Sequence, residues 1–182
     1  RGTKVEQCLE FAAEITAEFH IPFLFMTYYN ILYRYGPEKF INRAYDINIK
    51  GIIIPDLPPE EGGEYLELMK SLNLAPIQIF APTSSQERMQ LLARHGAGFI
   101  YCVARRGVTG KKTDFDQDFN AYIGRCRRAT SLPLAVGFGI RSRDDVDFLT
   151  GKADIAVIGT ETIRLVDAQG PEAVGPFIAG LR

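Results

Sequence analysis

Two short glycine-containing stretches have the residue types that bind an anion through backbone groups. Gly137 and Gly139 flank Phe138 at the end of one apolar run, and Gly159 followed by Thr160 ends the next. Glycine lets a ligand approach the backbone closely, and a helix that begins after such a turn offers N–H groups and the positive end of its dipole. A single turn of this kind is equally compatible with a tight connection that binds nothing. Its recurrence after the next run favours a phosphate site.

Six apolar runs, each followed by a helical pattern, would position these turns. Their first core residues are 21 to 35 residues apart, which is the spacing of βα units rather than of hairpins. The predicted strands are Ile21–Met26, Gly51–Ile54, Pro76–Phe80, Phe99–Val103, Leu134–Gly137 and Asp154–Ile158. The predicted helices are Val5–Phe19, Pro37–Asp46, Glu60–Leu72, a helix from a Ser84–Glu87 capping box to Gly96, Phe119–Ala129, Arg143–Leu149 with Ser142 as its N-cap, and a helical pattern from Glu161 onward.

Two architectures fit this order of elements. A doubly wound open sheet could be complete with six strands, but it favours a Gly-x-Gly-x-x-Gly turn after its first strand, and here Thr27 follows Met26. Phosphate-binding turns after the last two strands are typical of the (β/α)₈ TIM barrel. We therefore predict an α/β fold of this class, with a single barrel domain over residues 1–182. About six of its βα units are present, and because the chain opens on Arg1 we expect the barrel to be incomplete at its N-terminus.

Composition excludes several classes of function. A length of 182 residues with 46% hydrophobic content suits one globular domain, and a net charge of −1 without a basic stripe argues against a nucleic-acid partner. No apolar run approaches the length of a membrane span. The three cysteines are widely spaced and lack cysteine or histidine neighbours, so neither a disulfide framework nor a metal site is expected. These features favour a cytoplasmic protein.

In a barrel the C-terminal ends of the strands share one face, so the candidate site follows from the strand assignments. Its members would be mostly apolar or aromatic, and they include Met26, Tyr28, Ile53 and Tyr101. Together with the glycine turns, this set suits a flat hydrophobic group joined to a phosphorylated tail. Tyr101 could equally be a packed core residue. Asp56 could transfer protons or cap the next helix.

The loop from Ala104 to Asp116 is longer than a barrel connection requires. It places Thr109 between glycines, so it is either a lid that closes on the site or an exposed insertion. The two histidines, His20 and His95, are predicted at helix C-termini, where a positive charge suits the dipole.

Four runs resemble the tryptophan synthase α subunit in their order and spacing. They are FMTYYN at Phe25–Asn30, GIIIPDLPPEE at Gly51–Glu61, ARRGVTG at Ala104–Gly110 and GFGI at Gly137–Ile140. The resemblance implies a barrel lyase that cleaves indole-3-glycerol phosphate to indole and glyceraldehyde 3-phosphate by a retro-aldol step in tryptophan biosynthesis. It implies no cofactor in this chain, and a pyridoxal-phosphate-dependent β subunit as partner in an α2β2 assembly.

The resemblance also assigns roles to individual positions. It implies phosphate binding by Gly110, Gly137, Phe138, Gly139, Gly159 and Thr160, where Thr160 replaces the usual serine. It implies an indole pocket lined by Met26, Tyr28 and Ile53, with Tyr101 in support and Thr109 as the lid residue. The positions expected to meet the β subunit are Asn30, Ile31, Tyr33 and Pro58. In the lid, Ala104 replaces a usual serine and Arg106 is bulkier than usual.

One departure bears on catalysis. The family's general acid/base glutamate and its partner aspartate lie on and just after the second strand of the barrel, and this chain begins later. Two other functions therefore stay open from the sequence: a non-catalytic barrel that docks on another protein, and a barrel enzyme for another sugar phosphate. The full-length sequence would distinguish them, because the first hypothesis requires an upstream strand that ends in glutamate.

Overall fold

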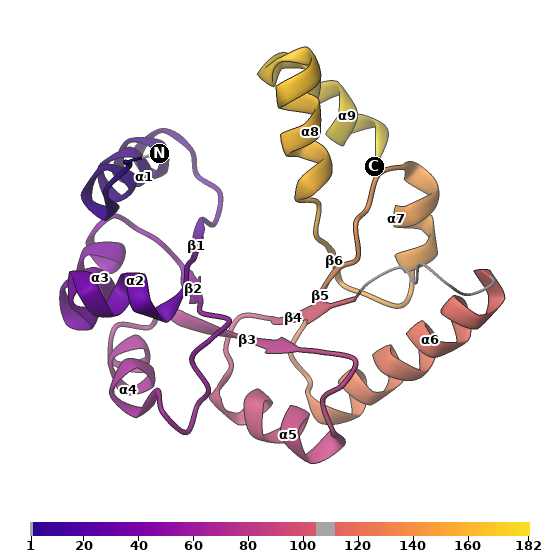
Figure 1. The fold of residues 1–182 in the computed structure, drawn as a ribbon, viewed down its shortest axis with the longest axis horizontal. Coiled ribbons are helices and arrows are strands. Elements are labelled where there is room, and N and C mark those ends of the chain that lie inside the picture. Colours follow the sequence, from indigo (N-terminus) through magenta and orange to yellow (C-terminus); the bar gives the residue numbers. More distant parts are fainter. Residues whose placement is uncertain (1, 105–111) are drawn as a thin grey trace. The chain divides into compact units, whose positions relative to one another are not determined.

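The computed structural model describes residues 2–104 and 112–182. The chain falls into two compact units, which we describe separately. The first unit is Arg1–Ile79 with Leu92–Gly98, and the second is Phe80–Leu91 with Phe99–Arg182. Figure 1 shows the chain colours running from indigo through the first unit to yellow at the end of the second.

The first unit contains a group of parallel strands and the helices that connect them (Figure 1). Its elements are α1 (Val5–Glu18), β1 (Leu24–Met26), α2 (Tyr29–Tyr35), α3 (Pro37–Asp46), β2 (Gly51–Ile53), α4 (Gly63–Ser71) and β3 (Ala75–Phe80), of which the last residue belongs to the second unit. Strand β2 lies between β1 and β3, and both pairs are parallel, with Met26 opposite Ile53 and Ile53 opposite Ile77. Parallel pairing requires a crossover between successive strands, and the helices supply it.

The core of the first unit lies between its strands and helices. Each helix contributes a fully buried or nearly buried residue: Leu9 from α1, Leu32 from α2, Ile41 from α3 and Met69 from α4. These pack with Ile52 of β2, whose exposed fraction is 0%. A strand covered by helices has no polar face, which explains the unbroken apolar run that predicted it.

The second unit repeats the same plan. It comprises most of α5 (Gln86–His95), then β4 (Ile100–Val103), α6 (Lys112–Ala129), β5 (Leu134–Gly137), α7 (Arg143–Leu149), β6 (Ile155–Ala156), α8 (Thr160–Gln169), the 3₁₀ turn η1 (Pro171–Ala173) and α9 (Val174–Gly180). Strand β5 lies between β4 and β6, and both pairs are parallel, with Tyr101 opposite Ala135.

Helix α6 is fixed to its unit by a buried hydrogen bond and an aromatic cluster. The Tyr122 hydroxyl donates to the Phe80 carbonyl at 2.8 Å. The rings of Phe119, Phe138 and Phe148 lie with centroids 5.1 to 6.0 Å apart, which joins α6 to α7 and to the turn after β5. Burial raises the pKa of the Tyr122 hydroxyl, so it remains a proton donor at any physiological pH.

Each of the six predicted strands is present, although most are shorter than their apolar runs. Strand β1 begins at Leu24 rather than Ile21, and β6 covers Ile155–Ala156 alone. Helix α2 was not predicted, because its seven residues are too few for a periodic pattern and its N-cap residue, Tyr28, makes no side-chain cap. Helix α6 begins at Lys112, before the predicted Phe119, because residues 112–118 are mostly polar and contain one apolar residue, Phe115, which is too little for a periodic pattern.

Three helix ends also differ from the prediction. The predicted Ser84–Glu87 capping box is wrong, because Ser85 accepts the Arg88 N–H at 3.2 Å while Ser84 accepts the Ala81 N–H in the preceding turn. Helix α4 begins at Gly63 rather than Glu60. It follows turns in which the Pro58 and Pro59 carbonyls accept backbone N–H groups. The predicted C-terminal helix is interrupted at Gly170, whose φ of 91° is left-handed, and Pro171 follows it.

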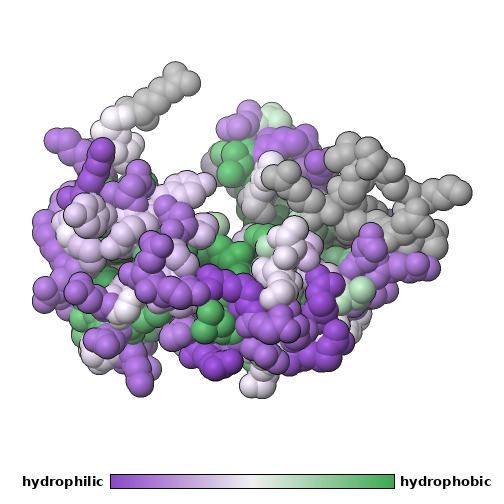
Figure 2. Space-filling model, turned by 60° about the horizontal axis from the view of Figure 1, so that its bottom comes forward, coloured by the Kyte–Doolittle hydropathy of each residue, from purple (hydrophilic) through white to green (hydrophobic). Residues whose placement is uncertain are grey.

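The surface drawn in Figure 2 is mainly hydrophilic, and its hydrophobic residues show as separate areas between polar ones. Among residues 2–104 and 112–182, no helix is long and apolar enough to cross a membrane. His95 is the last residue of α5, as predicted, and His20 lies two residues beyond the end of α1.

Candidate functional site

The C-terminal ends of β1 and β2 form an apolar group in the first unit. Met26 pairs with Ile53 across the two strands, and the Thr27 N–H extends this pairing by donating to the Ile53 carbonyl at 3.1 Å. Met26 and Tyr28 are 59% and 61% exposed, whereas Ile53 is nearly buried at 9%. The three predicted indole-pocket residues of this unit are thus neighbours, and two of them offer large apolar surfaces that solvent can reach.

Helix α2 carries three of the residues predicted to meet a partner. Asn30, Ile31 and Tyr33 are exposed on this helix, while Pro58, which was predicted with them, is half-buried in the loop after β2. Aromatic side chains such as Tyr33 are enriched at protein interfaces. Three of the four predicted contact residues are thus exposed, and their role at an interface stays a prediction.

Asp56 caps a helix, but not the one predicted. Its Oδ1 accepts the backbone N–H of Tyr29, the first residue of α2, at 2.8 Å. The following helix, α4, begins with Gly62 as its N-cap and has no side-chain cap. The carboxylate therefore joins the loop after β2 to the start of α2. The sequence could not show this, because the two residues are 27 positions apart.

In the second unit, Tyr101 and Gly137 lie side by side near the ends of β4 and β5. A Cβ placed on Gly137 would stand 2.8 Å from the Tyr101 hydroxyl oxygen, closer than side-chain contacts allow. Glycine at position 137 thus makes room for this hydroxyl, a reason that the sequence did not reveal. Burial raises the pKa of Tyr101, so the phenol stays protonated and can donate a hydrogen bond.

The turn after β5 divides into a buried side chain and an open backbone. The Phe138 ring is buried in the cluster with Phe119 and Phe148, so this residue could bind a ligand only through its backbone. Gly139 has a φ of +85°, a conformation that L side chains rarely adopt, and nothing lies within 4 Å of the position its Cβ would take. The turn therefore requires glycine and leaves space beside it.

Backbone N–H groups at the start of α7 find hydrogen-bond partners within the protein. Ser142 is the N-cap, as predicted, and the Asp145 carboxylate accepts the N–H groups of Arg141 and Ser142 at 2.9 and 3.1 Å and the Ser142 hydroxyl at 3.2 Å. Asp145 is buried. Two of the backbone N–H groups beside the start of this helix, where the sequence suggested a phosphate, are therefore engaged by a side chain.

The start of α8 is more open. Gly159 is its N-cap and Thr160 its first helical residue, and nothing lies within 4 Å of the position that a Gly159 Cβ would take. The Gly159 carbonyl accepts the N–H of Thr162 and the Thr162 hydroxyl. In the same turn Arg164 pairs with Glu161 at 2.6 Å and lowers the pKa of that carboxyl. This pairing offsets the negative charge nearest to the helix N-terminus.

Two predicted site residues, Thr109 and Gly110, lie outside the described residues, as does the predicted lid over residues 105–111. The predicted loop is wrong over residues 112–116, because these residues form the start of α6. In the part of the chain that the structure describes, no group of three or more His, Cys, Asp or Glu side chains could hold a metal ion.

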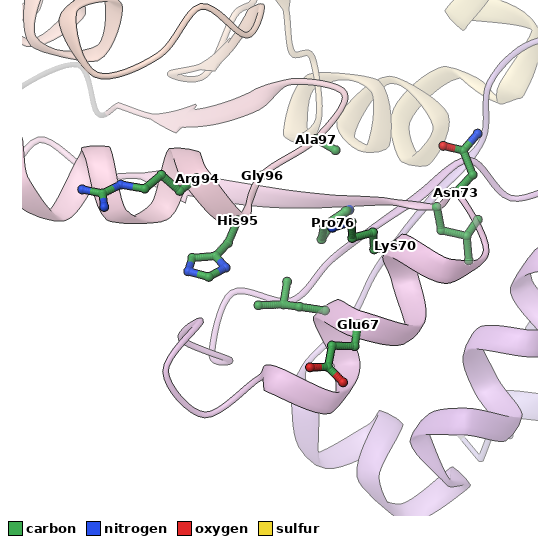
Figure 3. Close-up of a pocket in the computed structure, with 10 residues that line it drawn as sticks. Glu67, Lys70, Asn73, Pro76, Arg94, His95, Gly96 and Ala97 are labelled. Carbon is green, nitrogen blue, oxygen red and sulfur yellow. The ribbon is translucent and has the colours of Figure 1, made fainter.

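A surface pocket of about 400 Å³ lies elsewhere in the first unit. Figure 3 shows Glu67 and Lys70 of α4 facing the end of α5, where His95 extends toward them. The pocket includes Pro76, near the start of β3, so it is next to the N-terminal end of a strand. Barrel enzymes keep their sites at the opposite, C-terminal ends. The pocket is therefore separate from the candidate site.

Comparisons with known proteins identify the family to which the chain belongs. The family model described as tryptophan synthase alpha chain matches residues 1–175. The chain belongs to this family. A tryptophan synthase alpha chain from Desulforapulum autotrophicum is 59% identical over 180 residues, a match that covers 99% of this chain and 71% of the relative.

Two solved structures extend the likeness to the fold. The tryptophan synthase alpha subunit from Campylobacter jejuni is 30% identical with a TM-score of 0.89, covering 100% of this chain and 72% of that one. A chain of the tryptophan synthase complex from Pyrococcus furiosus is 25% identical with a TM-score of 0.86, covering 99% and 73%.

The predicted TIM-barrel class is therefore confirmed, as is the function of a tryptophan synthase α-subunit lyase in amino-acid biosynthesis. The two alternative functions, a docking barrel and another sugar-phosphate enzyme, are not favoured.

Proposed function

We propose that the full-length protein cleaves indole-3-glycerol phosphate to indole and glyceraldehyde 3-phosphate by a retro-aldol step in the cytoplasm, without a cofactor of its own. The observation that carries this proposal is the family match over residues 1–175. The residues at the strand ends support it. The first unit has exposed apolar side chains there, and the second unit has glycine turns and the N-terminus of α8.

In this proposal Met26, Tyr28 and Ile53 contact the indole ring. Their apolar surfaces suit a flat aromatic group, and the long Met26 side chain adapts its shape to such a partner. Tyr101 supports catalysis through its hydroxyl, which the absence of a side chain at Gly137 accommodates. A protonated phenol donates a hydrogen bond and does not add a negative charge near the phosphate.

The phosphate would bind to backbone N–H groups of Gly110, Gly137, Phe138, Gly139 and Gly159 and to Thr160. Because Asp145 occupies the start of α7, the helix dipole that favours the phosphate would be that of α8. The Thr160 hydroxyl keeps the donor that serine supplies elsewhere in the family. The open space at Gly139 and Gly159 would let phosphate oxygens approach the backbone.

The proton transfers would be carried out by two carboxylates outside the 182 residues. The reaction protonates an indole carbon while the ring nitrogen's proton is held or removed, and two carboxylates in different environments can divide these tasks. Asp56 is engaged with the Tyr29 N–H, which favours a structural role for it over proton transfer. The full-length sequence is the direct check on this part of the proposal.

We also propose a pyridoxal-phosphate-dependent β subunit as the partner in an α2β2 assembly, with the cofactor belonging to that subunit. The contact residues would be Asn30, Ile31, Tyr33 and Pro58, which lie on α2 and in the loop after β2. Support comes from the exposure of Asn30, Ile31 and Tyr33 and from the Pyrococcus furiosus relative, which was solved as a tryptophan synthase complex.

The proposal is tested through the lid residue Thr109, which would hydrogen-bond to one of the missing carboxylates when the loop closes. Thr109→Val removes the hydroxyl at nearly constant volume. We expect kcat for indole formation to fall at least tenfold, about 1.4 kcal/mol, because closure completes the catalytic arrangement after substrate binds. Thr150→Val, at an exposed threonine that ends α7, is the matched control.

The assay measures indole release from indole-3-glycerol phosphate with the β subunit present. Equal turnover in Thr109→Val and its parent would remove the lid role from this loop. An inactive full-length parent would instead favour a barrel that only docks on its partner.

A further inference from the structure

We propose that Asp56 is a positioning residue for the partner surface. Its carboxylate would hold the first turn of α2, with Tyr28, Asn30 and Ile31, in a fixed place beside the loop that carries Pro58. This inference rests on the proposed function, because it assigns the two segments to one partner surface. Asp56 itself touches neither substrate nor cofactor in this role.

The start of α2 depends on a group from outside the helix. The N-cap residue Tyr28 makes no side-chain cap, and the first turn contains no acidic residue. The Asp56 Oδ1 accepts the Tyr29 N–H at 2.8 Å, which satisfies one of the backbone donors that a helix N-terminus leaves without a partner. Its negative charge also lies at the positive end of the helix dipole. One side chain thus supplies both the hydrogen bond and the charge that usually come from a helix's own N-cap.

The contact continues the pairing of two strands beyond their ends. Met26 lies opposite Ile53, and the Thr27 N–H donates to the Ile53 carbonyl at 3.1 Å. Two residues later the Tyr29 N–H meets Asp56. The exposed Tyr28 therefore lies between two backbone N–H groups that are both held by residues 53–56, one of them by Asp56.

The remainder of α2 is held by other contacts, so the effect of Asp56 is local. Leu32 is fully buried in the core of the first unit. Near the C-terminal end, the Tyr35 hydroxyl donates to Glu6 of α1 at 2.6 Å, and the Lys39 ammonium lies 4.3 Å from the centre of the Tyr35 ring. Loss of the Asp56 carboxylate should release the first turn while the helix stays attached.

The loop that contributes the carboxylate also contributes to the predicted interface. Pro58 stands two residues after Asp56, and its carbonyl accepts the Glu61 and Gly62 N–H groups at 3.0 and 3.1 Å. A single hydrogen bond therefore ties two segments that are far apart in the sequence and that the partner would contact together. Preorganising a binding surface in this way raises affinity by lowering the entropy that is lost on association.

The experiment compares Asp56→Ala and Asp56→Asn with the parent in the full-length protein. Calorimetric titration with the β subunit gives Kd, and hydrogen–deuterium exchange of the free protein reports on the segment that includes Tyr29. We expect Asp56→Ala to weaken β-subunit binding about fivefold or more, and to speed exchange in this segment but not around Tyr35. Asp56→Asn keeps an oxygen acceptor, so it should restore binding to within about twofold of the parent.

Asp46→Ala removes an exposed carboxylate from the C-terminal end of α3 and serves as the matched control. A parent that binds the β subunit, with Asp56→Ala binding it equally well, would overturn the role of Asp56 and leave the proposed function intact. The same holds if Asp56→Ala lowers only the melting temperature, or if Asp56→Asn fails to restore binding. A parent that does not bind the β subunit would overturn the proposed partner and this inference with it.

Discussion

The contact between Gly137 and Tyr101 allows a sharp test of the role of the tyrosine. In Gly137→Ala the new methyl carbon would lie 2.8 Å from the Tyr101 hydroxyl oxygen, and ordinary contact begins near 3.4 Å. The oxygen must therefore move by about 0.6 Å, while the ring carbon that bears it, at 3.5 Å, is already at an acceptable distance. Gly137 is not among the glycines with positive φ, so alanine is compatible with the backbone.

The expected result is a loss of activity with little loss of stability. A rotation of a few degrees about the tyrosine side-chain torsions moves the hydroxyl far enough, and such a rotation costs well under 1 kcal/mol. In the proposed role of Tyr101, displacing the hydroxyl lowers the reaction rate more than it lowers stability, because rates depend steeply on the placement of reacting groups. We expect kcat/KM for indole-3-glycerol phosphate cleavage to fall about tenfold, which corresponds to about 1.4 kcal/mol.

A double-mutant cycle distinguishes this explanation from general damage. Tyr101→Phe removes the oxygen that the new methyl group would contact. In that background Gly137→Ala should change kcat/KM by less than about twofold, so the two effects should be clearly non-additive. The assay is indole formation by the full-length protein with the β subunit, and thermal melting confirms the fold. A tenfold loss on adding Gly137→Ala to Tyr101→Phe would refute the reasoning, since the oxygen would then be irrelevant.

Two further predictions concern stability in the second unit. Tyr122→Phe should lower the free energy of urea-induced unfolding by about 1 to 2 kcal/mol, because the buried Phe80 carbonyl loses a 2.8 Å hydrogen bond; an unchanged value would contradict this. For Asp154, the Leu134 N–H at 2.7 Å and then Arg127 hold the pKa of the carboxyl below its usual value. Its stabilisation is therefore present above the unfolded pKa of about 3.9 and is lost as pH falls through the lower folded pKa. The parent should exceed Asp154→Asn in unfolding free energy by less than about 1 kcal/mol at pH 6, since the pair is exposed, and this difference should shrink on acidification below about pH 4; a difference that grows there would have the wrong sign.

The sequence predicted the elements best where burial alone determines them. Runs such as Gly51–Ile54 and Leu134–Gly137 are apolar without alternation because helices cover the strands, and this signal is local. Helix α2 gave no such signal, because it is short and its cap comes from Asp56, far away in the sequence. Elements whose ends depend on side chains from distant positions cannot be predicted from local patterns.

The candidate site shows the same division between local and non-local causes. The positive φ of Gly139 and the N-cap role of Ser142 follow from neighbouring residues, so the turn after β5 was predictable. The reason for glycine at position 137 was not, because it depends on the Tyr101 hydroxyl of the neighbouring strand. From sequence alone, a glycine that lets phosphate approach the backbone cannot be distinguished from a glycine that leaves room for a neighbouring side chain.

The capping of α7 decides how the predicted phosphate site should be understood. A carboxylate and a phosphate compete for the same helix N-terminal N–H groups, and Asp145 already holds those of Arg141 and Ser142 from a buried position. Moving that carboxylate aside would leave a buried charge without its hydrogen bonds, which is costly. In the proposed function, the helix dipole that would favour a phosphate is therefore that of α8. There Gly159 leaves open space, and the Glu161 carboxylate that would repel an anion is paired with Arg164. In that proposal Gly139 would contribute its open backbone, and Asp145 would hold residues 141 and 142, which follow the glycine turn.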